Sequence, residues 1–231
     1  MKKMSLDREM ARLIVLQRIE LISPFLKRVR KTLGRYVFSN FVAKFFINPS
    51  FIGHQYYQLM EEEFQEIKKH INFKGKNILS IGCGMGGLEL VISQKYPKNL
   101  FDFIEKNYIS KKVKYGWDQK NNEAYNKLKL LNYFLINNGM PKKSFSLHDC
   151  DKDKLPIKKF DIIISLFSLD YHYDFNIYLD YFKKTSNKKT EIIFDTIRPE
   201  YFKDIFRNVK ILNFKENTVH KSKRIACSEF I

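Results

Sequence analysis

The chain has 231 residues, of which 44% are hydrophobic and 15% aromatic, so it can bury a sizeable core, and this composition excludes a disordered protein. Its 42 Lys and Arg against 25 Asp and Glu give a net charge of +17, which favours anionic partners, although an AT-rich genome that enriches Lys, Asn, Ile and Phe explains the charge equally well. Three scattered cysteines (Cys83, Cys150 and Cys227) exclude a disulfide framework and a zinc site. The sequence has no signal peptide and no run of ~20 uncharged apolar residues, which excludes a membrane span. We therefore expect a cytoplasmic protein without a metal.

The first 54 residues are predicted to form a helical extension. Apolar residues recur at helical spacing over residues 7–22, and Ser23 followed by Pro24 is typical of a helix start. A second helix is predicted from Pro24 to about Phe46, where Asn48-Pro49-Ser50 would break it.

This second helix is basic and amphipathic. It suits either packing on the rest of the chain with its charges in water, which we favour, or contact with an anionic membrane surface or a partner. We expect the extension to serve solubility or acceptor access and to lie outside any cofactor site.

A glycine-rich turn follows a third predicted helix over residues 56–71. The run Asn77-Ile-Leu-Ser-Ile-Gly-Cys-Gly-Met-Gly-Gly87 joins an apolar strand to that turn, and a helical pattern starts at Leu88. Glycines without a Cβ let a ligand lie against the main chain. A second apolar run ends on Glu105, about twenty residues beyond the turn, where α/β nucleotide-binding folds place the carboxylate that binds ribose hydroxyls. A dinucleotide loop is the competing interpretation, since Gly87 supplies the third glycine of G-x-G-x-x-G.

The run Ile78-Leu-Ser-Ile-Gly-Cys-Gly-Met-Gly resembles the first motif of class I S-adenosylmethionine-dependent methyltransferases, hydrophobic-hydrophobic-Asp-hydrophobic-Gly-x-Gly-x-Gly. The resemblance implies S-adenosylmethionine as the cofactor. The cofactor-binding residues that it implies in this part of the chain are Ser80, Gly82, Cys83, Gly84, Gly86 and Glu105. Ser80 replaces the acidic residue of the family motif, so a neutral hydroxyl there is expected to hold the ammonium of the cofactor less firmly.

The rest of the chain alternates helices and strands. A helix is predicted over residues 123–137, and further strands over residues 144–148, 160–167, 191–195, 209–215 and 223–230. This order predicts an α/β, doubly wound, Rossmann-like sheet of seven strands with an antiparallel last strand, in a methyltransferase domain of residues 55–231. The class I resemblance covers residues 73–199.

Polar residues follow the third and fourth predicted strands. In the family an acidic side chain after the third strand accepts from the adenine amino group, and Asp149 is preferred to Asp151 for this role. Ser165 begins the segment at the crevice edge and is assigned to the cofactor. Further along it, His172 is the candidate general base with Asp170 beside it, because an unperturbed histidine has a pKa of ~6.5. A histidine that only bonds locally at a helix start is an equally good interpretation.

The segment over residues 165–173 also indicates the acceptor. It lacks the Asn-Pro-Pro-Tyr and Pro-Cys motifs of methyltransferases that modify bases, and its Ser-Leu-x-Ser-x-x-x-His-Tyr spelling resembles a bacterial group of predicted sugar O-methyltransferases. The resemblance implies O-methylation of a small polar acceptor, a sugar or glycan precursor. An RNA methyltransferase, favoured by the charge, and a non-catalytic binding module, favoured by Ser80, are the alternatives. The oligomeric state is not predicted.

Overall fold

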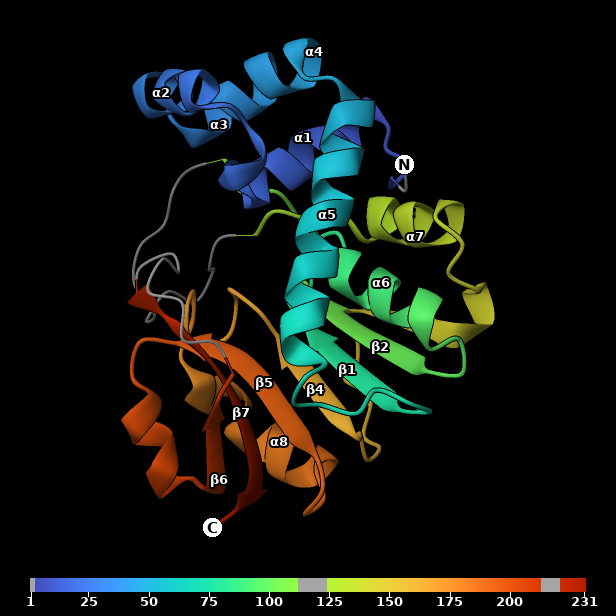
Figure 1. Cartoon of the computed structure of the whole chain (residues 1–231), viewed down its shortest axis with the longest axis vertical. Coiled ribbons are helices and arrows are strands. Elements are labelled where there is room, and N and C mark those ends of the chain that lie inside the picture. The colour runs from blue at the N-terminus through green and yellow to red at the C-terminus, as the bar shows by residue number, and fades with distance from the viewer. Residues whose placement is uncertain (1–2, 112–123, 213–220) are drawn as a thin grey trace.

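The computed structural model describes residues 3–111, 124–212 and 221–231. Seven strands form one sheet in the order β3-β2-β1-β4-β5-β7-β6 (Figure 1). Their bounds are β1 (Asn77–Ile81), β2 (Leu100–Glu105), β3 (Phe145–Asp149), β4 (Ile162–Ser165), β5 (Glu191–Thr196), β6 (Phe206–Ile211) and β7 (Lys223–Phe230). Strands β1 to β5 pair in parallel, and β7 lies antiparallel between β5 and β6. The predicted doubly wound sheet with an antiparallel last strand is confirmed.

Helices cover both faces of the sheet, because alternate side chains of each strand point to opposite faces. Ile162 and Ile164 of β4 enter the larger hydrophobic core, whereas Ile163 enters a second, separate core. Residues of α5 (Pro49–Ile67), α6 (Gly87–Lys95) and α7 (Leu128–Asn137) fill the larger core, and those of α8 (Leu179–Thr185) fill the second. Figure 1 shows α5 and α6 over β1 and β2, which places α6 directly beyond the glycine turn.

The N-terminal helices are shorter than predicted. Helix α1 (Arg8–Gln17) is followed by a 3-10 turn (Ile19–Leu21), and α2 (Pro24–Leu33) ends at Gly34, whose φ of 79° lies in a region that favours glycine. The predicted single helix to Phe46 is therefore wrong. The chain instead continues as α3 (Arg35–Val37), a π-helical turn (Phe38–Ala43) and α4 (Lys44–Phe46) at the upper end of Figure 1.

The third predicted helix starts seven residues earlier than expected, at Pro49. The side chain of Asn48 accepts hydrogen bonds from the backbone N–H groups of Ser50 and Phe51 at 2.9 and 3.3 Å, so the Asn-Pro pair caps a helix rather than breaking the chain. Helix α5 runs through the predicted boundary between residues 54 and 55. The N-terminal segment also packs on it, since the backbone N–H of Met4 donates to the carbonyl of Gly53 at 3.1 Å.

Two more predicted elements are shortened. Residue 123 lies outside the described residues, and residues 124–127 are not helical, because Ser110 exchanges hydrogen bonds with Ala124 at 2.8 and 2.9 Å. Strand β4 ends at Ser165 rather than at Phe167, whose φ of 52° is incompatible with a strand. Residues 213–215 of the strand predicted over residues 209–215 lie outside the described residues. None of the helices within the described ranges has the length and apolarity to cross a membrane.

Candidate active site

A cavity of about 650 Å³ opens at the carboxyl ends of β1, β2 and β4. Open α/β sheets bind ligands at this edge. The predicted site residues that line the cavity are Ser80, Gly82, Cys83, Gly84, Glu105 and His172. Four other predicted residues, Gly86, Asp149, Ser165 and Asp170, are not among its lining. The ends of the strands that the sequence analysis predicted to form the site therefore surround one cavity. Some polar residues at these strand ends do not line it.

The glycine turn leaves β1 by a path that needs positive φ angles. Gly82, Gly84 and Gly86 have φ values of 66°, 59° and 68°. A Cβ on Gly84 would lie 2.5 Å from the side-chain oxygen of Gln17, so the turn and α1 approach each other closely. Gly86 is the residue before α6 and packs against Leu131 and Leu135, which gives it a role in the turn rather than in the cavity wall.

Glu105 is fixed beside this turn. Its carboxylate accepts hydrogen bonds from the backbone N–H groups of Gly84 and Lys106, both at 2.9 Å. Burial raises the pKa of Glu105 to about 7, against these hydrogen bonds, which lower it. A half-buried carboxylate with spare lone pairs suits two vicinal hydroxyl donors. Burial, and then Glu105, also raises the pKa of the neighbouring Cys83 thiol, which therefore stays protonated.

The sequence analysis missed another carboxylate of the cavity wall, and this one is buried. Glu89 lies in the first turn of α6, and its Oε1 accepts a hydrogen bond of 2.5 Å from the Ser80 hydroxyl. Both residues line the cavity and are almost fully buried, at 3% and 1% exposure. Burial raises the pKa of Glu89 to about 7. A carboxylate of the facing helix therefore lies beside Ser80, the position at which the family motif carries an acid.

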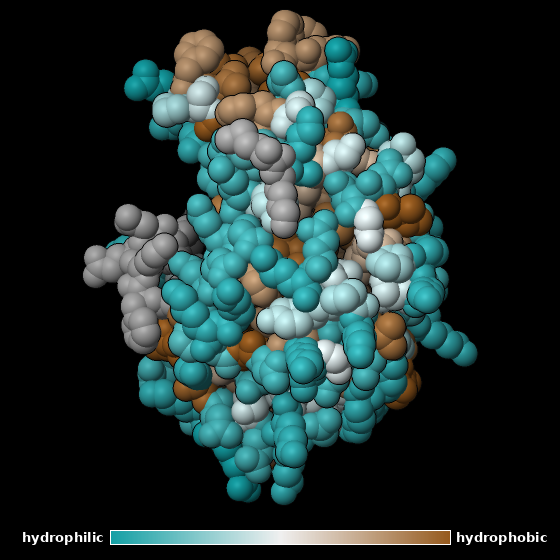
Figure 2. Space-filling model, turned by 45° about the vertical axis from the view of Figure 1, so that its right-hand side comes forward, coloured by the Kyte–Doolittle hydropathy of each residue, from teal (hydrophilic) through white to brown (hydrophobic). Residues whose placement is uncertain are grey.

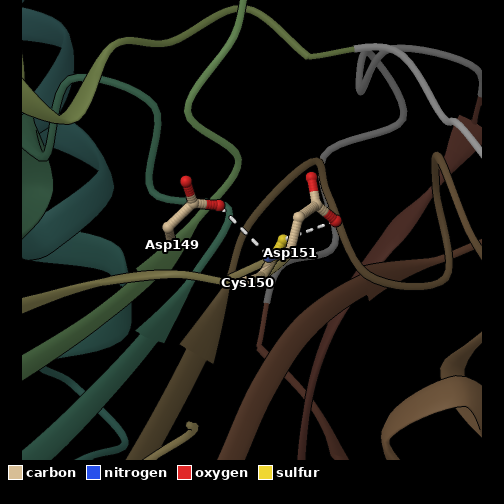
Figure 3. Close-up of side chains that lie close together, drawn as sticks. All are labelled: Asp149, Cys150 and Asp151. Carbon is tan, nitrogen blue, oxygen red and sulfur yellow. Dashed lines mark hydrogen bonds between the residues drawn. The ribbon is translucent and has the colours of Figure 1, made fainter. Parts of the chain in front are cut away.

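Asp151, and not the preferred Asp149, lies in the cavity wall. Asp149 is the last residue of β3, and its carboxylate accepts the backbone N–H of Asp151 at 3.1 Å (Figure 3). The carboxylate of Asp151 pairs with the ammonium of Lys106 at 2.9 Å. The sequence placed the end of β3 one residue too early, which made Asp149 look like a loop residue. Within the described residues, one group has the spacing of metal ligands, and it consists of Asp149, Cys150 and Asp151. We assign no metal to this group because the ammonium of Lys106 already neutralises Asp151.

Ser165 and Asp170 make structural contacts instead of facing the cavity. The Ser165 hydroxyl donates to the carbonyl of Ile81 at 2.8 Å and accepts from the N–H of Leu169 at 3.1 Å, which ties β4 to β1. The buried carboxylate of Asp170 accepts from the Thr196 hydroxyl at 2.6 Å and forms an ion pair with Arg198. Its charge therefore holds the segment after β4 to the end of β5.

His172 lies in the cavity wall. Its backbone N–H donates to the carbonyl of Ser168 at 2.8 Å, and its ring centre is 5.0 Å from that of Tyr171 and 6.1 Å from that of Tyr125. Tyr125 and Tyr171 line the same wall. His172 lies in a turn before the 3-10 helix Phe175–Tyr178 rather than at a helix start, and the residue contributes to the cavity wall.

The N-terminal helices also line the cavity, which is compatible with the predicted role in acceptor access. Gln17 at the end of α1 donates from its side chain to the carbonyl of Tyr125 at 3.0 Å. Arg18 forms an ion pair of 3.1 Å with Glu63 of α5. Its guanidinium also lies 4.7 Å from the ring centre of Phe167, within the range of a cation–π interaction.

Two further arginines of the N-terminal segment, Arg30 and Arg35, face the cavity near Tyr125. The Nε of Arg30 is buried and has no hydrogen-bond partner in the structure. Burial, and then the charge of Arg35, lowers the pKa of Arg30. Two cations so arranged favour an anionic group in this part of the cavity.

The chain matches no family model and no curated protein. Among solved structures it is similar to a predicted O-methyltransferase from Nostoc punctiforme, with a TM-score of 0.52 and 10% identity over 75% of this chain and 56% of that one. It is also similar to StiE O-MT, with a TM-score of 0.50 and 12% identity over 89% of this chain and 69% of that one. This chain therefore spans little more than half of the Nostoc protein. The likeness is one of fold, and it confirms that the chain has the fold of class I S-adenosylmethionine-dependent methyltransferases.

Proposed function

We propose that the protein is an S-adenosylmethionine-dependent methyltransferase. The observation that carries the proposal is the register between the glycine turn and Glu105, whose carboxylate is hydrogen-bonded to Gly84 at the wall of a cavity large enough for a nucleoside cofactor. A dinucleotide would place its pyrophosphate at the amino end of α6. The carboxylate of Glu89 lies buried in the first turn of that helix, and when ionised it would oppose the negative charge of a pyrophosphate.

The residues present fit the three parts of this cofactor. Glu105 would accept from the ribose hydroxyls, and Asp151 would accept from the adenine amino group in place of the predicted Asp149. Glu89, oriented by Ser80, would pair with the ammonium of the methionine end. When bound, the cofactor would supply an electrophilic methyl group. Glu89 also removes the argument for a non-catalytic binding module, which depended on Ser80 as a replacement for the family's acid.

The affinity for S-adenosylhomocysteine is expected to rise with pH. Glu89 and Glu105 each have a pKa of about 7 and must be ionised to pair with an ammonium or to accept from two hydroxyls. Between pH 8 and pH 6 protonation should weaken binding by about 10-fold for one group and about 100-fold for both. Calorimetry at pH 6, 7 and 8, in two buffers of different ionisation enthalpy, measures the affinity and the protons released. A constant affinity with no proton release would show that neither carboxylate binds the cofactor.

The acceptor that we propose is a hydroxyl of a sugar or glycan precursor. A hydroxyl needs a base to remove its proton, and the His172 imidazole in the cavity wall supports this role. Arg30 and Arg35 favour an acceptor that also carries an anionic group, such as the phosphate of an activated sugar. The same two arginines support RNA as the second candidate acceptor, because its backbone is a chain of phosphates.

Transfer of a radiolabelled methyl group tests this proposal. The protein is incubated with methyl-labelled S-adenosylmethionine and three acceptor sets: nucleotide-activated sugars, structured RNA and small amines. We expect label in the sugar fraction, and its transfer should fall when Arg30 and Arg35 are replaced by glutamine. Labelling of RNA alone would overturn the sugar acceptor, and labelling of amines alone would overturn O-methylation.

A further inference from the structure

Helices α2 to α4 and the start of α5 present a group of exposed aromatic side chains. Figure 2 shows tan and brown atoms gathered at the upper end of the molecule, over these helices. The exposed phenylalanines of this surface, which we call the aromatic cap, are Phe25 (70%), Phe41 (60%), Phe45 (54%), Phe46 (73%) and Phe51 (56%). Scattered single apolar residues are normal on protein surfaces, but five phenylalanines at one end of a molecule are not.

The side chains on the opposite face of these helices anchor the aromatic cap to the protein core. Tyr36, Phe38 and Ala43 are buried in the larger hydrophobic core, so α3 and the π-helical turn are anchored to the molecule. On the exposed side, the ring centre of Phe41 lies 5.9 Å from that of Phe45 and 6.1 Å from that of Phe46. Helix α2 has no buried residue at all. Leu26 and Val29 of α2 are partly buried against the larger core, so the packing favoured by the sequence holds for that side of the helix, while Phe25 stays exposed.

The segment that carries the cap has charged residues of one sign only. Residues 21–60 contain no Asp or Glu, and their six basic residues are Lys27, Arg28, Arg30, Lys31, Arg35 and Lys44. Arg28, Lys31 and Lys44 are exposed on the same helices as the phenylalanines. Exposed aromatic rings among exposed cations are typical of segments that lie in the interface of an anionic bilayer.

We propose that the aromatic cap docks on the surface of an anionic lipid bilayer. The phenylalanine rings would enter the boundary between head groups and acyl chains, and the surrounding cations would neutralise lipid phosphates. A second copy of the chain fits this surface less well, because it would bring the same acid-free basic segment against itself. Arg30 lines the cavity and lies on α2 together with Phe25, so lipid contact and the acceptor side of the cavity share one helix.

Sedimentation with lipid vesicles tests the proposal. Vesicles of phosphatidylcholine with 30% phosphatidylglycerol should pellet the protein, pure phosphatidylcholine should pellet much less, and 0.5 M salt should release part of it. The double variant Phe45→Asp, Phe46→Asp should bind the anionic vesicles at least about tenfold more weakly, since two rings lose their apolar burial. The matched control is Ile157→Asp, Ile197→Asp, which adds the same charge at residues exposed by 79% and 62% away from the cap.

The control should bind vesicles as the unchanged protein does. Because all four residues are exposed, the variants should fold, and an unchanged affinity for S-adenosylhomocysteine would confirm this without involving lipid. Equal vesicle binding by the two double variants would overturn the proposal, as would a failure of the unchanged protein to bind anionic vesicles. Light scattering that shows a dimer abolished by Phe45→Asp, Phe46→Asp would instead assign the cap to a second copy of the chain.

Discussion

Replacement of His172 by glutamine is expected to slow methyl transfer to a hydroxyl acceptor about 10²–10⁴-fold. A sugar hydroxyl keeps its proton at neutral pH, and His172 is the imidazole that the structure places in the cavity wall after β4. Glutamine preserves the size and polarity of the side chain but cannot take up the proton. The affinity for S-adenosylhomocysteine should stay within a few fold. The measurement is the rate of label transfer at saturating acceptor together with calorimetry of the same variant.

The control for His172 is its neighbour. Tyr171 lies against the His172 ring in the same wall, and burial raises the pKa of its hydroxyl, which makes it a poor base at neutral pH. Tyr171→Phe should therefore retain most of the rate. An unaltered rate in His172→Gln would remove His172 as the base and favour an amine acceptor, which can lose its proton to water before attack.

Glu89→Gln is expected to weaken the binding of S-adenosylhomocysteine by about 30-fold or more. Removing one partner of a buried, hydrogen-bonded charge pair typically costs about 2–5 kcal/mol. Glutamine can still accept the hydrogen bond from Ser80, so the first turn of α6 should keep its geometry. Methylthioadenosine has the nucleoside but not the amino-acid end, and its affinity should not change. Calorimetry with the two ligands therefore separates loss of the ammonium contact from damage to the fold.

A second substitution tests the same assignment in reverse. Ser80→Asp in the Glu89→Gln background returns the acid to the position that the family motif gives it, and it should restore part of the affinity for S-adenosylhomocysteine. Equal weakening of both ligands by Glu89→Gln would show that Glu89 only supports the turn, and the ammonium would then need another partner.

The sequence predicted those parts of the site that are encoded locally. The strand, the glycine turn and Glu105 follow one another with a fixed spacing, and the parallel pairing of β1 and β2 brings them together. Glu89 was also within reach of the sequence, since it follows Gly86 by three residues. Glu89 was missed because the sequence does not show which face of α6 points toward Ser80, and only the structure shows their hydrogen bond.

Other features depend on contacts that no local pattern encodes. Gln17 and Arg18 enter the cavity because α1 packs near the glycine turn, far away in sequence. Asn48 was interpreted as the end of a helix, because an Asn-Pro pair is found both where helices end and where they begin. Only the hydrogen bond from the backbone N–H of Ser50 to the Asn48 side chain shows that a helix begins here. Asp170 follows the strand as a catalytic residue would, and its role depends on Arg198, which lies 28 positions further along.

The central claim is that this chain binds S-adenosylmethionine through the glycine turn and Glu105. Calorimetry of the unchanged protein with S-adenosylhomocysteine and with NAD tests it most directly. The account predicts micromolar binding of S-adenosylhomocysteine, no binding of NAD, and a loss of roughly 1–3 kcal/mol in Glu105→Ala, where the ribose hydroxyls lose their charged acceptor. Binding of NAD in preference to S-adenosylhomocysteine would contradict it.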